Sequence, residues 1–590
     1  MSVSTRQPNR RPQPGNEMGP TIGLACAAGG TVGLGLIAWA GSLVNPSVQA
    51  MPNHGPSQVL TGYLGGDLDV TVPQVLVTGI LLGAGAGIVG YSVWMFRGFT
   101  KQGTRIDGKA QYMAGRDEAI EFYEAAATVD SERLRATGAG IGVTLGTHVN
   151  TKEKLYASWE WVQIWLMGPR AGKTSCVCVP QILETRGPVI ATSNKRDIVD
   201  ITRGPRSETG VVWVHDVQDI IGEAPSWWWN PLTFVRDIQT AEKLADIFIT
   251  SSTSAGAKQD AYFESAGKET LSRLLLAAAL DERPITDVFK WANNPDDEDD
   301  PALLLIEHGE AHLGEALGST QGLTPKQRDG VYGTLRPWIG VLGMRSVARW
   351  ITDNGTDRPH LNTEAFVTST DTIYLISKEG GGSARAITGA LTMALLEAAE
   401  RVGSRQVGGR LTTPLMAVLD EVANVCRWRE LPDVYSHYGS RGIIMSAFFQ
   451  SRQQGVEAFG ETGMGKLWSA ANVRVVGSGL SEDFLEFVST SIGDYDVVST
   501  SRSTQIGGTS TTRSLHRERI LDKADLTAMP KGRAVMLASQ TPPVLLQLDH
   551  ISQRPYAADA KASQDYYEAR AAKQGKPVRR NAGASVTSRK

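Results

Sequence analysis

The sequence has little that would place it among zinc-binding proteins or proteins strongly attracted to nucleic acid. It contains four cysteines, Cys26, Cys176, Cys178 and Cys426, and carries a formal net charge of −3 over 590 residues. The cysteines lack zinc-ligand spacing, and we predict that they are reduced, structural thiols in a cytosolic setting. A nearly neutral chain has no long-range attraction to phosphate, so any nucleic-acid contact must come from local basic patches. At this length, two or more domains are expected.

Charged residues are absent from two long stretches near the N-terminus, residues 21–44 and 72–96. Each stretch is long enough to cross a hydrocarbon layer of about 30 Å as a helix, and its glycines and alanines favour close packing of helices. Lysine and arginine flank the pair but are absent from residues 45–71, which predicts that both ends lie in the cytoplasm. A signal peptide cleaved near Val48-Gln49-Ala50 is the alternative, although cleavage would leave the second stretch in place.

A glycine-rich loop follows the apolar run 162–167 and reads LMGPRAGKTS over residues 166–175. In such a turn between a strand and a helix, backbone N–H groups face a phosphate, a lysine reaches the terminal phosphates and a hydroxyl ligates Mg²⁺. The sequence therefore predicts a loop that binds ATP and Mg²⁺. The predicted binding residues are Gly168, Pro169, Arg170, Ala171, Gly172, Lys173, Thr174 and Ser175.

The loop departs from the usual pattern, which has four residues between its two glycines. Only three residues separate Gly168 from Gly172, and Met167 stands where the first glycine is expected. A surface turn with a chance similarity is therefore the alternative interpretation.

A second motif, PLMAVLDEVAN at residues 414–424, is an apolar strand that ends in Asp420 and Glu421. Open α/β sheets bind ligands beyond the carboxyl ends of their strands. At such an edge Asp420 can hold Mg²⁺, and Glu421 can orient and deprotonate an attacking water molecule. The alternative is an ordinary strand end that caps a helix. Together the two motifs favour a P-loop ATPase.

Short apolar runs alternate with helical patterns through much of the chain, which predicts an α/β fold with a mostly parallel sheet covered by helices. Between residues 236 and 350 the strand signal disappears, and apolar spacings of three and four from Phe263 to Ala278 predict an inserted all-α domain. The strand-like runs are residues 188–193, 211–215, 372–376, 415–419, 443–449 and 473–476.

Two charged segments remain, one inside the expected all-α domain and one at the C-terminal end. The acidic run 296–300 is predicted to be a solvated loop or, alternatively, a docking site for a basic partner. Residues 556–590 are poor in large apolar side chains and are predicted to form a disordered basic tail. The predicted order is a cytoplasmic tail at 1–20, membrane helices at 21–44 and 72–96 with an extracytoplasmic loop at 45–71, a nucleotide-binding domain at 97–235 and 351–555 that encloses the all-α domain at 236–350, and the tail at 556–590.

The order of the motifs resembles the TraG/VirD-type coupling proteins of bacterial conjugation and type IV secretion, a membrane-anchored branch of the FtsK/HerA translocase ATPases. The resemblance covers about residues 72–550, and the short loop and Thr174, where many members carry glycine, indicate a divergent branch. Its further segments are VIATSNKRDIVD (189–200), WNPL (229–232), YFESAG (262–267), GSRGIIMSAFFQSRQQ (439–454), SEDFLEFVSTSIGD (481–494) and RERILDKADLTAMPKGRAVML (517–537).

The resemblance implies a RecA-like P-loop NTPase domain, anchored by two N-terminal transmembrane helices in the bacterial cytoplasmic membrane. It also implies a homo-hexameric ring with ATP bound between neighbouring subunits. By position, Lys173 would contact the terminal phosphates and Glu421 would activate water. Thr174 and Asp420 would hold Mg²⁺.

Two further residues acquire roles through the same resemblance. Gln450, at the end of the apolar run 443–449, matches the position of a polar side chain that senses the γ-phosphate; a simple strand-end amide is the alternative. Arg441 is the preferred arginine to act on the phosphates of a neighbouring subunit, with Arg385 and Arg452 behind it.

The leading functional hypothesis is an ATP-driven motor that recruits DNA or a DNA–protein complex, with relaxase and relaxosome proteins, to a type IV secretion channel. A protein-secretion ATPase without nucleic-acid cargo is the first alternative, and DNA-stimulated hydrolysis would separate the two. A non-hydrolytic membrane receptor for secretion substrates is the second alternative. Transfer that survives the change Glu421→Gln would favour the receptor.

Overall fold

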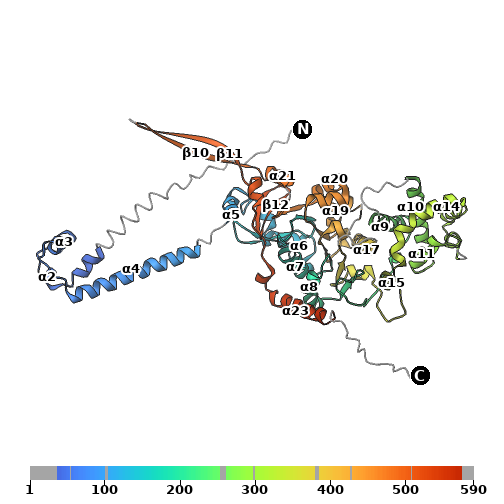
Figure 1. The fold of residues 1–590 in the computed structure, drawn as a ribbon, viewed down its shortest axis with the longest axis horizontal. Helices are drawn as coiled ribbons and strands as arrows, with labels where there is room; N and C mark the ends of the chain where they lie inside the picture. Colours follow the sequence, from blue (N-terminus) through green and yellow to red (C-terminus); the bar gives the residue numbers. More distant parts are fainter. Residues whose placement is uncertain are drawn as a thin grey trace, which may run out of the picture. The chain divides into compact units, whose positions relative to one another are not determined.

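A computed structural model of the protein describes residues 36–574, apart from 54, 100–103, 253–260, 297–298, 379–384, 426–427, 429, 481 and 506–507. The chain divides into two compact units (Figure 1). One comprises Met1–Gly108 and Asp494–Glu518, and the other comprises Lys109–Gly493 and Arg519–Lys590.

The larger unit is built on an 11-stranded sheet with the strand order β2-β1-β13-β12-β9-β3-β8-β7-β4-β6-β5. From β9 to β5 neighbouring strands are parallel, whereas from β2 to β9 the pairs are antiparallel. The parallel strands coincide with the apolar runs expected from the sequence. They are β3 (Gln163–Leu166), β4 (Val189–Ser193), β5 (Val212–His215), β6 (Thr372–Ile376), β7 (Leu415–Leu419), β8 (Ile443–Phe449) and β9 (Val473–Gly477).

Helices cover both faces of the parallel part of the sheet, as the continuous apolar strands require. On one face α7 and α8 contact the strands, and α23 packs on α8; on the other face lie α17, α18, α19 and α20. The bounds are α7 (Val179–Glu184), α8 (Asp197–Ser207), α16 (Thr363–Val367), α17 (Arg385–Ser404), α18 (Val422–Val425), α19 (Leu431–Ser440), α20 (Arg452–Ala470), α21 (Glu482–Ile492), α22 (Lys523–Thr527) and α23 (Ala557–Gln574).

The antiparallel strands were not among the strands expected from the sequence. The second half of the glycine-rich segment 137–146 enters a buried strand, because Val143 and Leu145 pack into the core. The strands are β1 (Val143–His148), β2 (Lys154–Ala157), β12 (Arg533–Ala538) and β13 (Thr541–Gln547), and the short helices α5 (Arg105–Lys109) and α6 (Glu124–Arg133) precede them in the chain.

Between β5 and β6 the described residues form helices and no strand, in agreement with the apolar spacing of the sequence. Within the acidic run, Asp296 is largely exposed, as expected of a solvated loop, and pairs with Arg328. Asp300 caps α12 by accepting from the N–H of Ala302. The helices are α9 (Ile238–Ser252), α10 (Ala261–Leu280), α11 (Thr286–Asn293), α12 (Pro301–Glu307), α13 (Ala311–Gln321), α14 (Pro325–Ile339) and α15 (Arg345–Ile351).

The smaller unit contains helices near the N-terminus and a two-stranded ribbon (Figure 1). The helix expected over residues 72–96 is present as α4, whereas most of the expected span 21–44 lies outside the described residues. No helix in the described part of the chain combines the length and the apolar character needed to cross a membrane. The elements are α2 (Pro46–Gln49), α3 (Pro56–Gly65), α4 (Val72–Phe99), β10 (Asp494–Gln505) and β11 (Gly508–Arg519).

The expectation of a disordered tail from residue 556 is wrong for its first half, because Ala557–Gln574 form α23. The helix is anchored on α8 by polar contacts that composition does not reveal. The Ser563 hydroxyl donates to the carbonyl of Asp200 at 2.6 Å and accepts from the N–H of Gly204 at 3.1 Å. Residues 575–590 lie outside the described part of the chain.

Candidate nucleotide site

The candidate site lies at one edge of the parallel sheet. Strands β3, β8, β7 and β4 are near neighbours in the strand order, and they run parallel. Their carboxyl ends therefore meet at the same edge, where open α/β sheets bind ligands. This edge brings together the loop after β3, Asn194 after β4, Asp420 and Glu421 after β7, and Gln450 after β8.

Main-chain hydrogen bonds fix the start of the loop. The N–H of Met167 donates to the carbonyl of Phe449 at 3.0 Å, and the N–H of Gly168 donates to the carbonyl of Ser478 at 2.9 Å. Gly168 touches the backbone of Gly479 so closely that a Cβ atom at position 168 would overlap it. Position 168 therefore has no space for a side chain, although the loop departs from the usual glycine pattern.

Further along the loop the chain turns through left-handed conformations. Arg170 has φ 62° and Gly172 has φ 91°. Pro169 and Arg170 are exposed at the tip, whereas Ala171 is buried. Lys173 then leads into a π-helical turn, Thr174–Cys178, that continues as α7. This strand–loop–helix path is the one that the sequence predicted.

Lys173 and Asp420 form an ion pair across the edge, although they are distant in the sequence. The Lys173 Nζ lies 2.6 Å from Oδ1 of Asp420 and 3.9 Å from Oε1 of Glu421. The exposed fraction of the side chain is 11% for lysine and 6% for each carboxylate. The two motifs recognised separately in the sequence thus form one buried cluster.

Burial shifts the pKa of both partners of this pair. Burial lowers the pKa of Lys173, but the Asp420 and Glu421 carboxylates outweigh that effect and leave the pKa raised. Burial raises the pKa of Asp420, and the Lys173 ammonium opposes part of the rise. Two carboxylates beside one buried ammonium leave the cluster with a net negative charge. A further cation is therefore favoured at this site.

Glu421 is held in an unusual conformation. Its backbone φ is 56°, in the left-handed region that costs a non-glycine residue about 1–3 kcal/mol. Gln450 donates its side-chain amide to Oε1 of Glu421 at 2.6 Å, and Asn194 donates its amide to Oε2. The Thr192 hydroxyl donates to the carbonyl of Asp420 at 3.0 Å. Strands on both sides of β7 therefore position its carboxylates.

The structure does not bring every predicted residue into this cluster. Thr174 and Ser175 lie on the turn that follows Lys173. Arg441 ends α19, just before β8, at the opposite end of that strand from Gln450. It donates to the carbonyl of Gly409 at 2.9 Å. Its role toward a neighbouring subunit stays a prediction.

Asn194 is the residue at this edge that the sequence reasoning missed. It directly follows the buried strand β4, as Asp420 follows β7 and Gln450 follows β8. The signal was therefore available: a polar side chain immediately after a buried parallel strand.

The donor set at this edge suits Mg²⁺. Mg²⁺ prefers oxygen ligands and is often bound through one or two protein groups together with substrate phosphates. The Asp420 carboxylate and the Thr174 hydroxyl are donors of that kind. Within the described residues no group of three or more His, Cys, Asp or Glu side chains could form an all-protein metal site.

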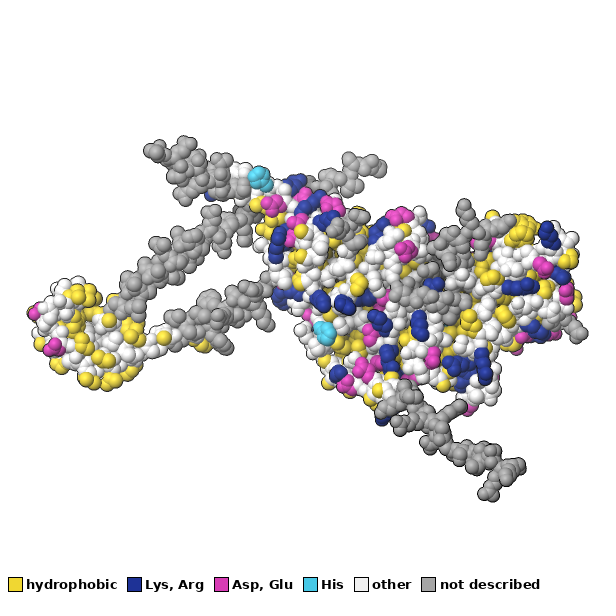
Figure 2. Space-filling model, in the orientation of Figure 1, with side chains coloured by type: hydrophobic (Ala, Val, Ile, Leu, Met, Phe, Trp, Pro, Cys, Tyr) yellow, Lys and Arg dark blue, Asp and Glu magenta, His cyan; other side chains and the backbone are white. Residues whose placement is uncertain are grey.

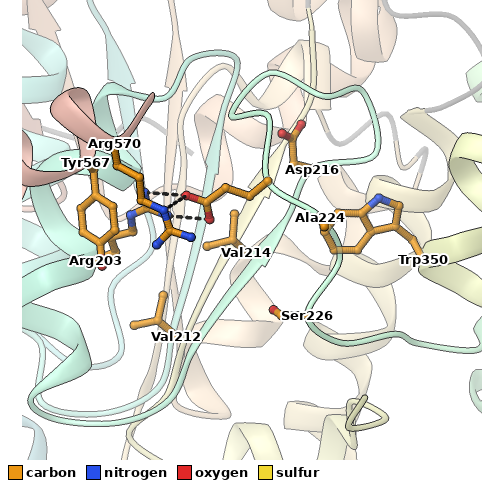
Figure 3. A pocket seen from close by; sticks show the side chains of 10 residues that line it. Arg203, Val212, Val214, Asp216, Ala224, Ser226, Trp350, Tyr567 and Arg570 are labelled. Atoms are coloured by element: carbon orange, nitrogen blue, oxygen red, sulfur yellow. Dashed lines mark hydrogen bonds and ion pairs between the residues drawn. The ribbon is translucent and has the colours of Figure 1, made fainter. Parts of the chain in front are cut away.

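Apart from this edge, a cavity of about 190 Å³ lies beside β5 and is lined by residues of α8 and α23 among others (Figure 3). Arg203 donates to both oxygens of Glu223 at 3.1 Å, and its guanidinium carbon lies 3.2 Å from the centre of the Tyr567 ring. Arg570 lies 3.9 Å from Glu223, and Trp350 stands on the far wall. We call Arg203, Glu223, Tyr567 and Arg570 the α23 cluster.

Comparison with known proteins gives one family match within the chain. Residues 414–531 match the family described as "TraM recognition site of TraD and TraG". This segment begins just before β7 and includes Asp420, Glu421 and Gln450. No sequence among the curated proteins matches the chain.

Several solved structures are similar to this chain. The bacterial conjugative coupling protein TrwBdeltaN70 in its unbound monoclinic form has a TM-score of 0.51 at 13% identity, covering 72% of this chain and 94% of that one. The plasmid coupling protein TrwB with ADP and Mg²⁺ scores 0.48 at 15% identity, covering 67% and 87%. VirB4 of Thermoanaerobacter pseudethanolicus scores 0.43 at 13% identity, covering 71% and 98%. The first of these shows a shared fold.

The sheet, its covering helices and the charged carboxyl edge define an α/β protein with the architecture of TrwB. The family match over residues 414–531 and the shared fold both support the resemblance found in the sequence, that to the TraG/VirD-type coupling proteins.

Proposed function

We propose that the protein is a membrane-anchored ATPase that couples ATP hydrolysis to the movement of DNA, or of a DNA–protein complex, into a secretion channel. The observation that carries the proposal is the ion pair between Lys173 and Asp420, with Glu421 beside it. Three residues from two distant motifs meet at the ligand-binding edge of the sheet, as a P-loop ATPase requires.

Each residue at the edge has a proposed role in phosphoryl transfer. The backbone N–H groups of residues 168–173 and the Lys173 ammonium would bind the phosphates of ATP. Thr174 and Asp420 would hold Mg²⁺, which when bound neutralises charge on the phosphate oxygens. Lys173 must then leave Asp420 for the phosphates, and its present contact marks the place that a cation would take.

Glu421 is the proposed general base. Its carboxylate would accept a proton from the attacking water, and Gln450 would report the presence of the γ-phosphate through its contact with the same carboxylate. Arg441 would stabilise the transferring group from a neighbouring subunit of a homo-hexameric ring. The ring and the arginine both rest on the resemblance to coupling proteins.

The partners are proposed from the family match. A segment that matches the TraM recognition site of TraD and TraG favours contact with a DNA-processing (relaxosome) protein. Charge-free stretches at residues 21–44 and 72–96, with basic residues outside them, support an anchor in the bacterial cytoplasmic membrane with the ATPase unit in the cytoplasm.

The proposal is tested with the full chain in detergent, by measuring ATP hydrolysis with and without DNA alongside the oligomeric mass. We expect Mg²⁺-dependent hydrolysis that DNA stimulates, in a species larger than a monomer. ATP hydrolysis at the same rate with and without DNA would favour protein cargo instead. ATP binding without any hydrolysis would favour a receptor.

A further inference from the structure

We propose that Asn194 is a positioning residue for ATP hydrolysis: with Gln450, it clamps the Glu421 carboxylate in the orientation in which it activates water. The inference rests on the proposed function and assigns a role to a side chain that neither the motifs nor the resemblance singled out.

The clamp comes from two different strands. In the sheet, β7 lies between β8 and β4. Gln450, after β8, donates to one oxygen of Glu421 at 2.6 Å, and Asn194, after β4, donates to the other oxygen. Hydrogen bonds from opposite sides fix both the position and the rotation of the carboxylate plane, which one bond alone would leave free to turn.

The backbone at or beside the two amide-bearing residues is itself held in place. The N–H of Gln450 donates to Oε1 of Gln454 at 3.0 Å, in the first turn of α20. On the other side, Thr192 donates to the carbonyl of Asp420 at 3.0 Å, and the N–H of Lys195 donates to Oγ of Ser193 at 3.1 Å. Thr192 and Asn194 are two residues apart, so β4 holds the backbone at 420 and the side chain at 421 together.

The geometry favours positioning over restraint. If Asn194 held Glu421 in an inactive position, the Glu421 side chain would point away from Lys173. Instead, Oε1 of Glu421 lies 3.9 Å from Nζ of Lys173. The left-handed backbone at Glu421, φ 56°, also indicates that the surroundings dictate where this side chain goes. Neutral amides hold the carboxylate in this way without neutralising its charge, and a carboxylate oxygen can accept more than one hydrogen bond.

The first test compares kcat and KM for ATP in the full chain and three variants, Asn194→Ala, Asn194→Asp and Asn362→Ala. We expect Asn194→Ala to lower kcat about 10-fold or more with KM changed less than about twofold, because misplacement of a reacting group affects the chemical step. Asn194→Asp keeps the size but lacks the amide donor and adds negative charge beside Glu421, so it should be no more active than the alanine variant. Asn362 is an exposed residue that caps α16, and its variant controls for loss of an asparagine elsewhere.

Three results would overturn the inference. Full activity in Asn194→Asp would show that only shape matters at this position. Faster hydrolysis in Asn194→Ala would show that Asn194 restrains Glu421. An equal loss in Asn362→Ala would show general destabilisation.

A second test does not depend on hydrolysis and so separates this inference from the proposed function. Thermal midpoints are measured for the wild type, Asn194→Ala, Glu421→Gln and the double variant. Hydrogen bonds to an ionised group are stronger than neutral ones, so Asn194→Ala should cost more with glutamate than with glutamine at position 421. Additive effects would overturn the clamp, whereas a wild type that hydrolyses no ATP would overturn the proposed function.

Discussion

Two charged clusters in the larger unit contain a glutamate with contrasting partners. At the carboxyl edge, Glu421 accepts from the neutral amides of Asn194 and Gln450. Beside β5, Glu223 faces the guanidinium groups of Arg203 and Arg570. A carboxylate held by amides keeps its negative charge available to a ligand, whereas one matched by guanidinium groups has its charge satisfied by the protein itself.

The surroundings of the two glutamates also differ. Glu421 stands beside a glycine-rich loop and the Lys173 ammonium, in a strained backbone conformation. Glu223 lies in the α23 cluster, where a tyrosine ring covers the Arg203 guanidinium. The first arrangement is suited to change its partners when a nucleotide binds, and the second is suited to fasten a helix to the sheet. Charge and burial alone would not separate them.

The larger and smaller units also differ in their surfaces. On the visible face, lysine, arginine and acidic side chains are interspersed over the larger unit, whereas apolar side chains gather over the N-terminal helices of the smaller one (Figure 2). In α4, Val72, Val75, Leu76 and Ile80 are each more than half exposed. Exposed apolar patches of this kind are typical of surfaces that contact another apolar surface. The membrane anchor itself stays a proposal.

The strongest test of the comparison makes the same substitution in both clusters. Glu421→Gln should lower ATP hydrolysis by about 100- to 10,000-fold, because it removes a general base, while ATP binding is retained. Glu223→Gln should leave hydrolysis within about twofold of wild type, because Glu223 lies outside the candidate nucleotide site. Steady-state hydrolysis and binding of a fluorescent ATP analogue measure both. Equal losses of hydrolysis in the two variants would contradict the assigned difference.

Lys173→Ala removes the positively charged side chain of the candidate nucleotide site. The change should lower ATP hydrolysis by about 100-fold or more, because it removes the positive charge that faces the phosphates. It also leaves Asp420 and Glu421 without their ammonium partner, so binding of Mg²⁺ alone should persist. Hydrolysis rates and calorimetric titration with Mg²⁺ check the two parts. Lys195→Ala, at an exposed position on the neighbouring turn, is the matched control.

Arg203→Ala tests the α23 cluster. The change removes one partner of a partly buried ion pair with Glu223, and the Tyr567 ring loses its cation as well. We expect α23 to open more often, which hydrogen–deuterium exchange over residues 557–574 would detect. Hydrolysis at saturating ATP should change little. Unchanged exchange in α23 would show that Ser563 and the other contacts suffice to hold the helix.

The parts of this molecule that the sequence predicted are those in which pattern and structure coincide. Parallel strands covered on both faces are continuous apolar runs, and polar residues directly after them mark the functional edge, as Asp420, Glu421 and Gln450 do. The antiparallel strands were missed because β1 and β13 contain polar residues, Gly146 and two prolines, which weaken the strand signal. Their partners are distant in the sequence, so no local pattern reports the pairing.

The α23 cluster could not be predicted for a related reason. Composition over residues 556–590 indicates disorder, and only contacts with α8 and Glu223, far away in the sequence, order the first half as a helix. Similarly, the role of Asn194 depends on its contact with Glu421, which becomes its neighbour only when β4 and β7 pair. Contacts between distant segments decide both cases.

His215, at the end of β5, provides the smallest and most specific test of the region around the α23 cluster. It is fully buried between Trp227 and Trp350, and burial lowers its pKa from 6.5 to about 3. Between these values the unfolded chain binds a proton that the folded protein does not. Stability should therefore fall as the pH drops below 6.5, by up to about 1.4 kcal/mol per pH unit, until the pH reaches about 3.

Substitution of His215 by phenylalanine removes this titration and retains a ring between the two tryptophans. The thermal midpoint of His215→Phe should therefore fall less than that of the wild type between pH 7 and pH 5. His312→Phe, at an exposed position on α13, should leave the wild-type pH dependence unchanged. If His215→Phe and the wild type lose stability in parallel, other groups cause the acid sensitivity. If the two proteins lose stability to different extents, the packing around Trp227 and Trp350 depends on a neutral His215. The carboxyl edge, in contrast, depends on charge that is retained.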